Sequence, residues 1–185
     1  SVSVQYSYLP SWLSLLVQPD YGEETAHAVF RAVYGHWRAL PQDQRPRLFL
    51  FGLSLGSLNS DLAGDAYAVL GDPFEGAFWV GPPFASRTWW RVTSTREAGS
   101  PAWLPKARDQ NVFRFITGED DTQTRQDGWG KVRILYLQYP SDPIVFFEMD
   151  MWRRRPAWMD KPQGPGVSPQ LAWLPGISFI QLIFD

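Results

Sequence analysis

The sequence contains no cysteine, only two histidines, little net charge and no long hydrophobic run. Without cysteine, the chain can form no disulfide bond, no thiolate zinc site and no cysteine nucleophile. A formal net charge of −2 gives no broad basic surface, so nucleic acid is not expected as a partner. No apolar segment reaches the length of a membrane-spanning helix. These absences restrict the function to classes that need neither thiol chemistry nor a strongly charged surface.

Aromatic side chains are abundant, with 10 Trp, 12 Phe and 7 Tyr among 185 residues. They could fill a core, line an apolar pocket or form a membrane-facing surface. Hydrophobic residues make up 44% and charged residues 19%, a balance typical of a folded domain rather than a disordered chain. The length suits one domain with a sizeable core.

The two ends of the sequence do not resemble domain boundaries, which usually lie in polar, flexible linkers. Ser1–Leu9 alternates like a strand from the first residue, and the apolar stretch Ile177–Phe184 runs to the penultimate one. We therefore expect a fragment of a longer protein. Residues 1–185 would form part of one catalytic domain, with an irregular insertion at about 82–130.

Apolar periodicity predicts strands that alternate with helices. Apolar residues recur at helical spacing over Glu23–Leu40, which predicts an amphipathic helix covering a sheet. The core strands are apolar throughout, as is typical of parallel sheets buried on both faces. Predicted strands are Ser1–Leu9, Arg47–Phe51, Gly76–Val80, Val112–Ile116 and Lys131–Gln138, and Leu171–Phe184 is predicted to be helical. This order predicts an α/β fold, a three-layer α/β/α sandwich with a mostly parallel sheet.

The pattern Gly52-x-Ser54-x-Gly56 lies between an apolar strand and a small-residue helix. This is the context of a nucleophile elbow, a tight strand-to-helix turn that lifts a serine hydroxyl above the sheet. Glycine at positions 52 and 56 would remove Cβ atoms that collide with neighbouring backbone. The backbone N–H of Leu55 would be one oxyanion donor. The alternative is an ordinary glycine turn between a strand and a helix.

Asp142 is the candidate acid, because it follows a predicted strand as Ser54 does. Functional groups of open α/β sheets gather at the carboxyl ends of the strands. In folds with a nucleophile elbow the chain order is serine, acid, histidine, and the acid holds the histidine in one tautomer. Asp142 could instead only shape the turn before a proline. Glu148 and Asp150 are alternative acids further beyond the strand end.

His27 and His36 both precede Ser54, on the predicted first helix. We expect them at the surface or at the interface of a covering helix, and not at the catalytic edge of the sheet. The histidine of the triad is therefore expected outside this chain. Because triad members act as a unit, the chain alone is expected to be nearly inactive.

Three further clusters could bind a ligand or serve only the fold. Arg153–Arg155 could meet lipid headgroups or an anionic partner, or form a solvated face. Glu119–Asp121 could suggest a metal, but adjacent side chains diverge, which favours a solvated loop. Four tryptophans could line an acyl pocket or pack in the core: Trp79, Trp89, Trp90 and Trp103.

Several short motifs occur in order along nearly the whole chain. They are Gln5–Trp12, Arg45–Ser57, Val80–Pro83, Gly99–Pro105, Tyr136–Pro143 and Val167–Pro169. With these motifs the chain resembles a bacterial α/β-hydrolase family whose full-length members join an N-terminal multi-span membrane region to a C-terminal catalytic domain. The resemblance implies an α/β-hydrolase fold, incomplete at both ends, with the serine at Ser54 and the acid at Asp142. Tyr139 departs from the family, in which histidine is frequent at this position.

The sequence therefore predicts a serine-dependent hydrolase that acts on an ester or thioester through an acyl-enzyme intermediate. The aromatic content favours a lipid-like acyl group. We expect no cofactor and no metal ion, a small-molecule ester as partner, and a soluble segment that the resemblance links to a membrane through a region absent from this chain. Esterase, lipase, thioesterase and acyltransferase activities all fit. The alternative is a non-catalytic binding or assembly module of a membrane protein that retains the hydrolase fold.

Overall fold

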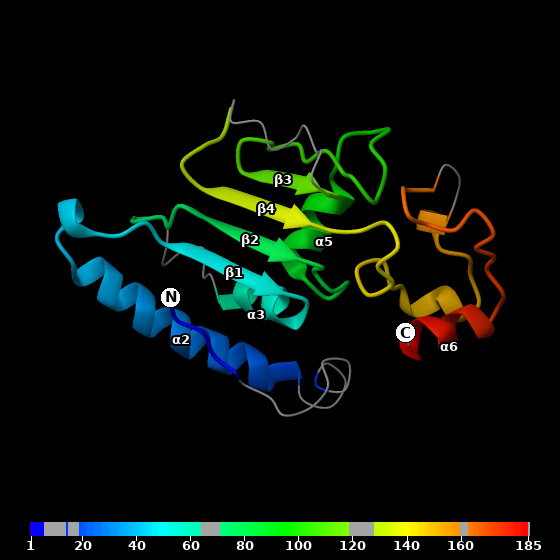
Figure 1. The fold of residues 1–185 in the computed structure, drawn as a ribbon, viewed down its shortest axis with the longest axis horizontal. Coiled ribbons are helices and arrows are strands. Elements are labelled where there is room, and N and C mark those ends of the chain that lie inside the picture. The colour runs from blue at the N-terminus through cyan, green and yellow to red at the C-terminus, as the bar shows by residue number, and fades with distance from the viewer. Residues whose placement is uncertain (6–13, 15–18, 64–70, 119–127, 160–162, 185) are drawn as a thin grey trace.

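The computed structural model describes residues 1–5, 14, 19–63, 71–118, 128–159 and 163–184, and its centre is a parallel sheet of four strands. The strands are β1 (Phe49–Leu53), β2 (Gly76–Val80), β3 (Phe113–Ile116) and β4 (Arg133–Leu137), in the spatial order β1-β2-β4-β3. Each neighbouring pair is parallel, so the carboxyl ends of the strands meet at one edge (Figure 1). The predicted α/β fold with a parallel sheet is confirmed.

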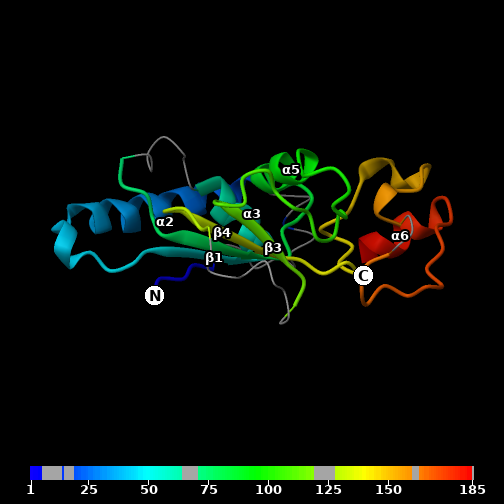
Figure 2. The same ribbon diagram turned by 90° about the horizontal axis from the view of Figure 1, so that it is seen from above.

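Helices α2 (Pro19–Ala39), α3 (Leu55–Ala63) and α5 (Arg87–Ser94) lie on one side of this sheet (Figure 2). The predicted helix over Glu23–Leu40 is confirmed as α2. Its buried stripe is aromatic, since Phe30, Tyr34 and Trp37 recur at helical spacing and their rings stack at 5.2 and 5.7 Å. This stripe fastens α2 to the core.

The core lies between the helices and the sheet. Trp79, Tyr136 and Phe115 are register neighbours on β2, β4 and β3. Their ring centroids lie 5.3 and 4.9 Å apart, and none of the three is more than 4% exposed. Burying each such side chain stabilises the fold by roughly 1.5–3 kcal/mol. These aromatic contacts hold the strand ends that carry the candidate site.

The opposite face of β1 is exposed, which corrects the prediction of a strand buried on both faces. Phe49, Phe51 and Leu53 are 58%, 68% and 62% exposed, whereas Gly52 is buried against the helices. The reason is that α2, α3 and α5 all lie on the same face of the sheet. An apolar run in the sequence does not indicate which of its two faces a layer covers. The strand also extends further than predicted and ends directly before Ser54.

The two ends of the chain also differ from prediction. Ser1–Gln5 forms no strand, and Val2 and Val4 are exposed, while the rest of the predicted strand lies outside the described residues. Helix α6 (Ile177–Phe184) is shorter than predicted. Pro175 and Gly176, whose φ is 73°, separate it from the preceding residues, because proline and a left-handed residue both interrupt a helix.

In the part of the chain that the structure describes, the remaining regular elements are three short 3₁₀ helices, η1 (Gln42–Gln44), η3 (Met149–Trp152) and η4 (Ala157–Met159). The segment with η3 and α6 lies beyond the carboxyl ends of the strands (Figures 1 and 2). Within the described ranges, no helix is both long enough and apolar enough to cross a bilayer. Glu119–Asp121 lies outside the described residues.

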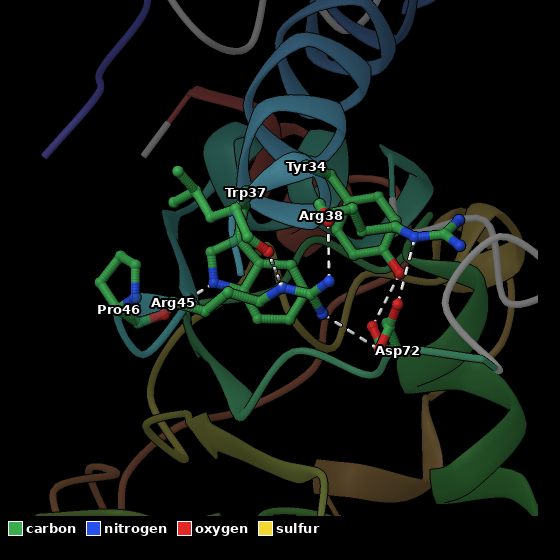
Figure 3. A network of polar contacts seen from close by, with 7 residues as sticks. Tyr34, Trp37, Arg38, Arg45, Pro46 and Asp72 are labelled. Atoms are coloured by element: carbon green, nitrogen blue, oxygen red, sulfur yellow. Dashed lines mark hydrogen bonds and ion pairs between the residues drawn. The ribbon is translucent and has the colours of Figure 1, made fainter. Parts of the chain in front are cut away.

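A polar network fastens the amino edge of the sheet (Figure 3). The carboxylate of Asp72, in the connection to β2, forms ion pairs of 3.3 Å with Arg38 and 3.1 Å with Arg45. The hydroxyl of Tyr34 donates a 2.7 Å hydrogen bond to the backbone carbonyl of Asp72. Arg45 also donates to two backbone carbonyls at the end of α2 and lies over the ring of Trp37. The network joins the end of α2 to the entry of β1 and β2.

Candidate active site

Ser54 lies in a tight bend between β1 and α3. Its φ is 52°, and it is the only non-glycine residue with positive φ in the described part of the chain. This left-handed conformation costs a residue with a Cβ atom about 1–2 kcal/mol. Such strain persists only where surrounding structure enforces it, and it concentrates at functional sites.

Hydrogen bonds on both sides enforce the bend. The N–H of Ser54 donates a 2.8 Å bond to the carbonyl of Val80 at the end of β2. The carbonyl of Ser54 accepts bonds from the N–H groups of Ser57 and Leu58, and a 2.7 Å bond from the Ser57 hydroxyl. Ser57 is 1% exposed. This role of Ser57 was not predicted from the sequence, although a hydroxyl in the first turn of a helix is a typical partner for a nearby backbone group.

The two glycines of the motif differ in their surroundings. A Cβ atom at Gly52 would lie 2.3 Å from the carbonyl oxygen of Gly56 and 2.5 Å from the nitrogen of Ser57. Only glycine therefore allows α3 to approach β1 so closely. A Cβ atom at Gly56 would meet nothing within 4 Å. The expected backbone collision thus occurs at Gly52 and not at Gly56, because the helix leaves open space beside the second glycine.

The first amide groups of α3 follow directly after Ser54. A helix leaves its first four N–H groups without intrahelical acceptors. Here the N–H groups of Ser57 and Leu58 are bonded to the carbonyl of Ser54. No acceptor among the described residues receives the N–H of Leu55 or of Gly56. These two donors, together with the positive end of the helix dipole, form an environment that favours negative charge beside Ser54.

Asp142 lies in the turn that follows β4, at the same edge of the sheet. Its N–H donates a 3.0 Å bond to the carbonyl of Tyr139, and its Oδ1 accepts a 3.0 Å bond from the N–H of Ile144. Asp142 therefore shapes its turn, as one of the two hypotheses stated. Its second oxygen faces Gly81, where a Cβ atom would lie 3.2 Å from Oδ2. One carboxylate oxygen is thus used by the turn and the other is not.

Gly81 lies between the two candidate residues. It follows Val80, the acceptor for Ser54, and its own N–H donates a 2.8 Å bond to the carbonyl of Leu137 at the end of β4. Its φ of 55° is one that glycine adopts without strain. Because β2 lies between β1 and β4, the ends of three adjacent strands bring Ser54 and Asp142 to one edge, on either side of Gly81. The position of Gly81 between the two candidate residues was not predicted from the sequence, where it belongs only to a short motif.

The alternative acids belong to a separate ion cluster. Arg154 lies 3.7 Å from Glu148 and 3.0 Å from Asp150, around η3. Burial raises the pKa of Glu148, and the charge of Asp150 raises it further, against the opposing effect of Arg154. Both carboxylates are thus engaged with an arginine, unlike Oδ2 of Asp142. The side chains of the Arg153–Arg155 run are exposed.

Both histidines lie on α2, as expected. His27 is half-buried, and its Nε2 lies 3.6 Å from the Glu23 carboxylate one turn earlier. His36 is exposed in the last turn, next to Trp37, whose indole N–H donates to the carbonyl of Pro46 before β1. His36 therefore lies toward the amino edge of the sheet, opposite Ser54. Within the described residues, no hydrogen bond or ion pair joins either histidine to the bend or to the Asp142 turn.

An acidic side chain on α3 connects the bend to α5. The carboxylate of Asp61 accepts a 3.1 Å bond from the N–H of Thr88 in the first turn of α5. The N-cap residue Ser86 makes no capping bond with its own side chain, so Asp61 supplies this cap from another helix. Burial raises the pKa of Asp61, against the lowering effects of Thr88, Arg91 and Arg87.

Three of the four tryptophans belong to the core and not to an open pocket. Trp79 and Trp89 are buried, Trp103 packs against the same cluster, and Trp90 is 63% exposed. No group of three or more His, Asp or Glu side chains in the described part of the chain is arranged to hold a metal ion.

Comparison with known proteins agrees with the fold. The model of a protein family described as an alpha/beta-hydrolase family matches residues 1–185. No curated protein and no solved structure shows a significant match. The family match covers the whole chain, and family membership suggests hydrolase activity. The chain therefore belongs to this alpha/beta-hydrolase family.

Proposed function

We propose that the protein is a serine hydrolase in which Ser54 attacks the carbonyl carbon of an ester or thioester. The observation that carries this proposal is the left-handed conformation of Ser54, with φ 52°, anchored to β2 on one side and to α3 on the other. A serine kept in a strained bend at the carboxyl edge of a parallel sheet is the arrangement of a nucleophile elbow. Ordinary glycine turns place glycine, and not serine, at the left-handed position.

The proposed reaction has two steps. Ser54 Oγ attacks the carbonyl, its proton passes to a histidine, and the alcohol or thiol leaves with that proton. Water then gives a proton to the same histidine and attacks the acyl carbon, the bond between Ser54 Oγ and the acyl group breaks, the carboxylic acid leaves, and Ser54 Oγ takes the proton back from the histidine. The N–H of Leu55 supports this role, because it begins α3 and is free of an acceptor among the described residues. Asp142 would orient the histidine through Oδ2, the oxygen that its own turn does not use.

The histidine itself would come from outside these residues. This part of the proposal is supported by the positions of the two histidines: His27 lies beside Glu23 on α2, and His36 lies in the last turn of α2, toward the amino edge. The 185 residues alone are expected to react several orders of magnitude more slowly than the complete protein. We also propose an apolar acyl group, which the exposed Tyr139 and Trp152 support. Membrane attachment through another region would bring such a site to lipid-like substrates.

A fluorophosphonate probe tests the proposal, because it reacts covalently with activated serines. We expect the full-length protein to be labelled and the Ser54→Ala variant to lose labelling. Ser94→Ala is the matched control, since this exposed serine on α5 donates only to the carbonyl of Arg91. Labelling that persists in Ser54→Ala would refute the proposal. No labelling of the wild type would favour the alternative, a binding or assembly module.

A second experiment tests whether Asp142 is the acid that orients the histidine. Asp142→Asn is expected to slow labelling by about 10³–10⁴-fold, because an amide no longer stabilises the imidazolium and its tautomer. Asp150→Asn serves as the control, since Asp150 is engaged with Arg154. The same loss in both variants would speak against Asp142 as the acid.

A further inference from the structure

Gln138 is a fully buried amide at the base of the Asp142 turn. It directly follows Leu137, the last residue of β4, and its side chain is 0% exposed. Its backbone N–H donates a 3.0 Å bond to the carbonyl of Ile116 at the end of β3. The chain then enters the turn closed by the bond between Asp142 and Tyr139. Gln138 therefore lies directly before the turn that carries the candidate acid.

The side chain of Gln138 is bonded at both of its polar atoms. Its Oε1 accepts a 2.7 Å bond from the indole N–H of Trp89, and its Nε2 donates bonds of 3.2 and 3.1 Å to the carbonyls of Ala102 and Trp103. The partners fix the orientation of the amide. A flipped amide would turn its oxygen toward two carbonyls and its NH₂ toward an N–H donor.

These bonds join the acid turn to the segment between β2 and β4. Trp89 lies on α5, and Ala102 and Trp103 lie in the loop that follows it. Helix α5 is in turn capped by Asp61 of α3, the helix that begins at the Ser54 bend. A continuous series of contacts therefore runs from the serine helix, through α5 and Gln138, to the turn of the acid.

We propose that Gln138 is a positioning residue that holds the Asp142 turn in place relative to Ser54; this inference rests on the proposed hydrolase function. Removing the amide would leave an indole N–H and two carbonyls buried without partners. Such groups are costly to bury, so the three segments would move apart to admit water or other partners. A displacement of about 1 Å at a catalytic group can cost on the order of 10²-fold in rate.

The test compares fluorophosphonate labelling rates of Ser54 in the full-length protein. Gln138→Met keeps the length of the side chain and removes its donors and acceptor. Gln110→Met is the matched control, because Gln110 is exposed and its amide bonds only Glu97, at 2.9 Å. We expect Gln138→Met to slow labelling on the order of 10²-fold, and Gln110→Met to leave the rate unchanged.

Two readouts separate positioning from a merely structural role. If Gln138 acts through Asp142, adding Gln138→Met to the Asp142→Asn variant should slow fluorophosphonate labelling by no more than about a further twofold. A misplaced carboxylate also stabilises the imidazolium less, so the pKa of the histidine falls. The acidic limb of the pH–rate profile should therefore move to lower pH in Gln138→Met and stay in place in Gln110→Met.

Trp89→Phe decides the matter if Gln138→Met does not fold. It keeps an aromatic ring in the core and removes the indole N–H that donates to Oε1 of Gln138, together with part of the buried indole ring. We expect a smaller slowing, roughly tenfold, with the same shift of the acidic limb.

Wild-type labelling rates in the folded variants would overturn the inference. So would an undiminished slowing by Gln138→Met in the Asp142→Asn background. Both results leave the proposed function intact. A wild type without Ser54-dependent labelling would overturn the proposed function and this inference together.

Discussion

The backbone N–H of Ser54 lies 2.8 Å from the carbonyl oxygen of Val80 and donates a hydrogen bond to it. The bend that carries the serine is thereby anchored to the end of the neighbouring strand. The next residue, Gly81, is bonded in the same way to Leu137 at the end of β4. The sheet edge thus holds Ser54 in a conformation that an unrestrained serine would leave.

Replacing Ser54 by glycine is expected to stabilise the protein relative to Ser54→Ala. Glycine adopts a φ of 52° without strain, whereas alanine retains the cost of its Cβ atom. After the entropy that glycine loses on folding, we expect a net gain of about 0.5–1 kcal/mol in the free energy of unfolding. Urea denaturation of the two variants measures this difference. A glycine variant less stable than the alanine variant would contradict the left-handed bend.

The two glycines of the motif should respond oppositely to alanine. Gly52→Ala forces a Cβ atom against the carbonyl of Gly56 and should destabilise the fold by about 2 kcal/mol or more. Gly56→Ala fills open space in a helix and should stabilise it by about 0.5–1 kcal/mol. The melting temperatures of the two variants should therefore move in opposite directions. Equal effects would mean that the close approach of α3 to β1 is absent.

The amino-edge network predicts unequal roles for its two arginines. Arg45→Met removes the ion pair to Asp72 and leaves two carbonyls near the end of α2 without their donor, so we expect a loss of about 2 kcal/mol. Arg38→Met removes one ion pair of a half-exposed side chain and should change stability by less than about 0.5 kcal/mol. Chemical denaturation of both variants provides the comparison. A larger effect at Arg38 would rule out this assignment.

The raised pKa of Asp61 predicts a pH-dependent stability. Folding raises this pKa above 3.8, so the native state favours the protonated carboxyl. The stabilising contribution is fully present below the unfolded pKa and is lost as the pH rises through the folded pKa. Asp61→Asn stays neutral and can still accept the bond from Thr88.

The stability of Asp61→Asn relative to the wild type should therefore increase as the pH rises above 3.8. Denaturation midpoints of both proteins over this range measure the difference. Other groups titrate in both proteins alike, so their contributions largely cancel when the two are subtracted. A difference that shrinks with rising pH would show that the pKa of Asp61 is not raised.

The sequence was sufficient to predict the elements whose pattern is local. Helix α2 follows from the spacing of its apolar residues, and Gly76–Val80 was predicted with the bounds that β2 has. The open face of β1 was not predictable, because Phe49 and Phe51 look the same in sequence whether or not a layer covers them. The spatial order of the strands was also not predictable, since β3 pairs with β4 through contacts that no local pattern records.

In the candidate site, too, some residues could be predicted from local sequence and others could not. Ser54 and Asp142 could be selected from motif context and strand ends, and both lie at the carboxyl edge. The residues that hold them in place could not be selected in this way. Gln138, Trp89 and Asp61 come from separate segments and acquire their partners only through tertiary packing. A single glutamine after a strand carries no signal of such a role.

The strand order has a consequence for synthesis on the ribosome. β3 emerges before β4, yet it pairs with β4, which lies between β2 and β3 in the sheet. The nascent chain can pair β1 with β2 early. The other edge of β2 stays unpaired until β4 has been synthesised. During that interval β3 is already synthesised and could pair incorrectly with β2, because an unpaired strand edge favours pairing with other strands. The part of the sheet formed by β2, β4 and β3 can therefore be completed only after β4 has been synthesised.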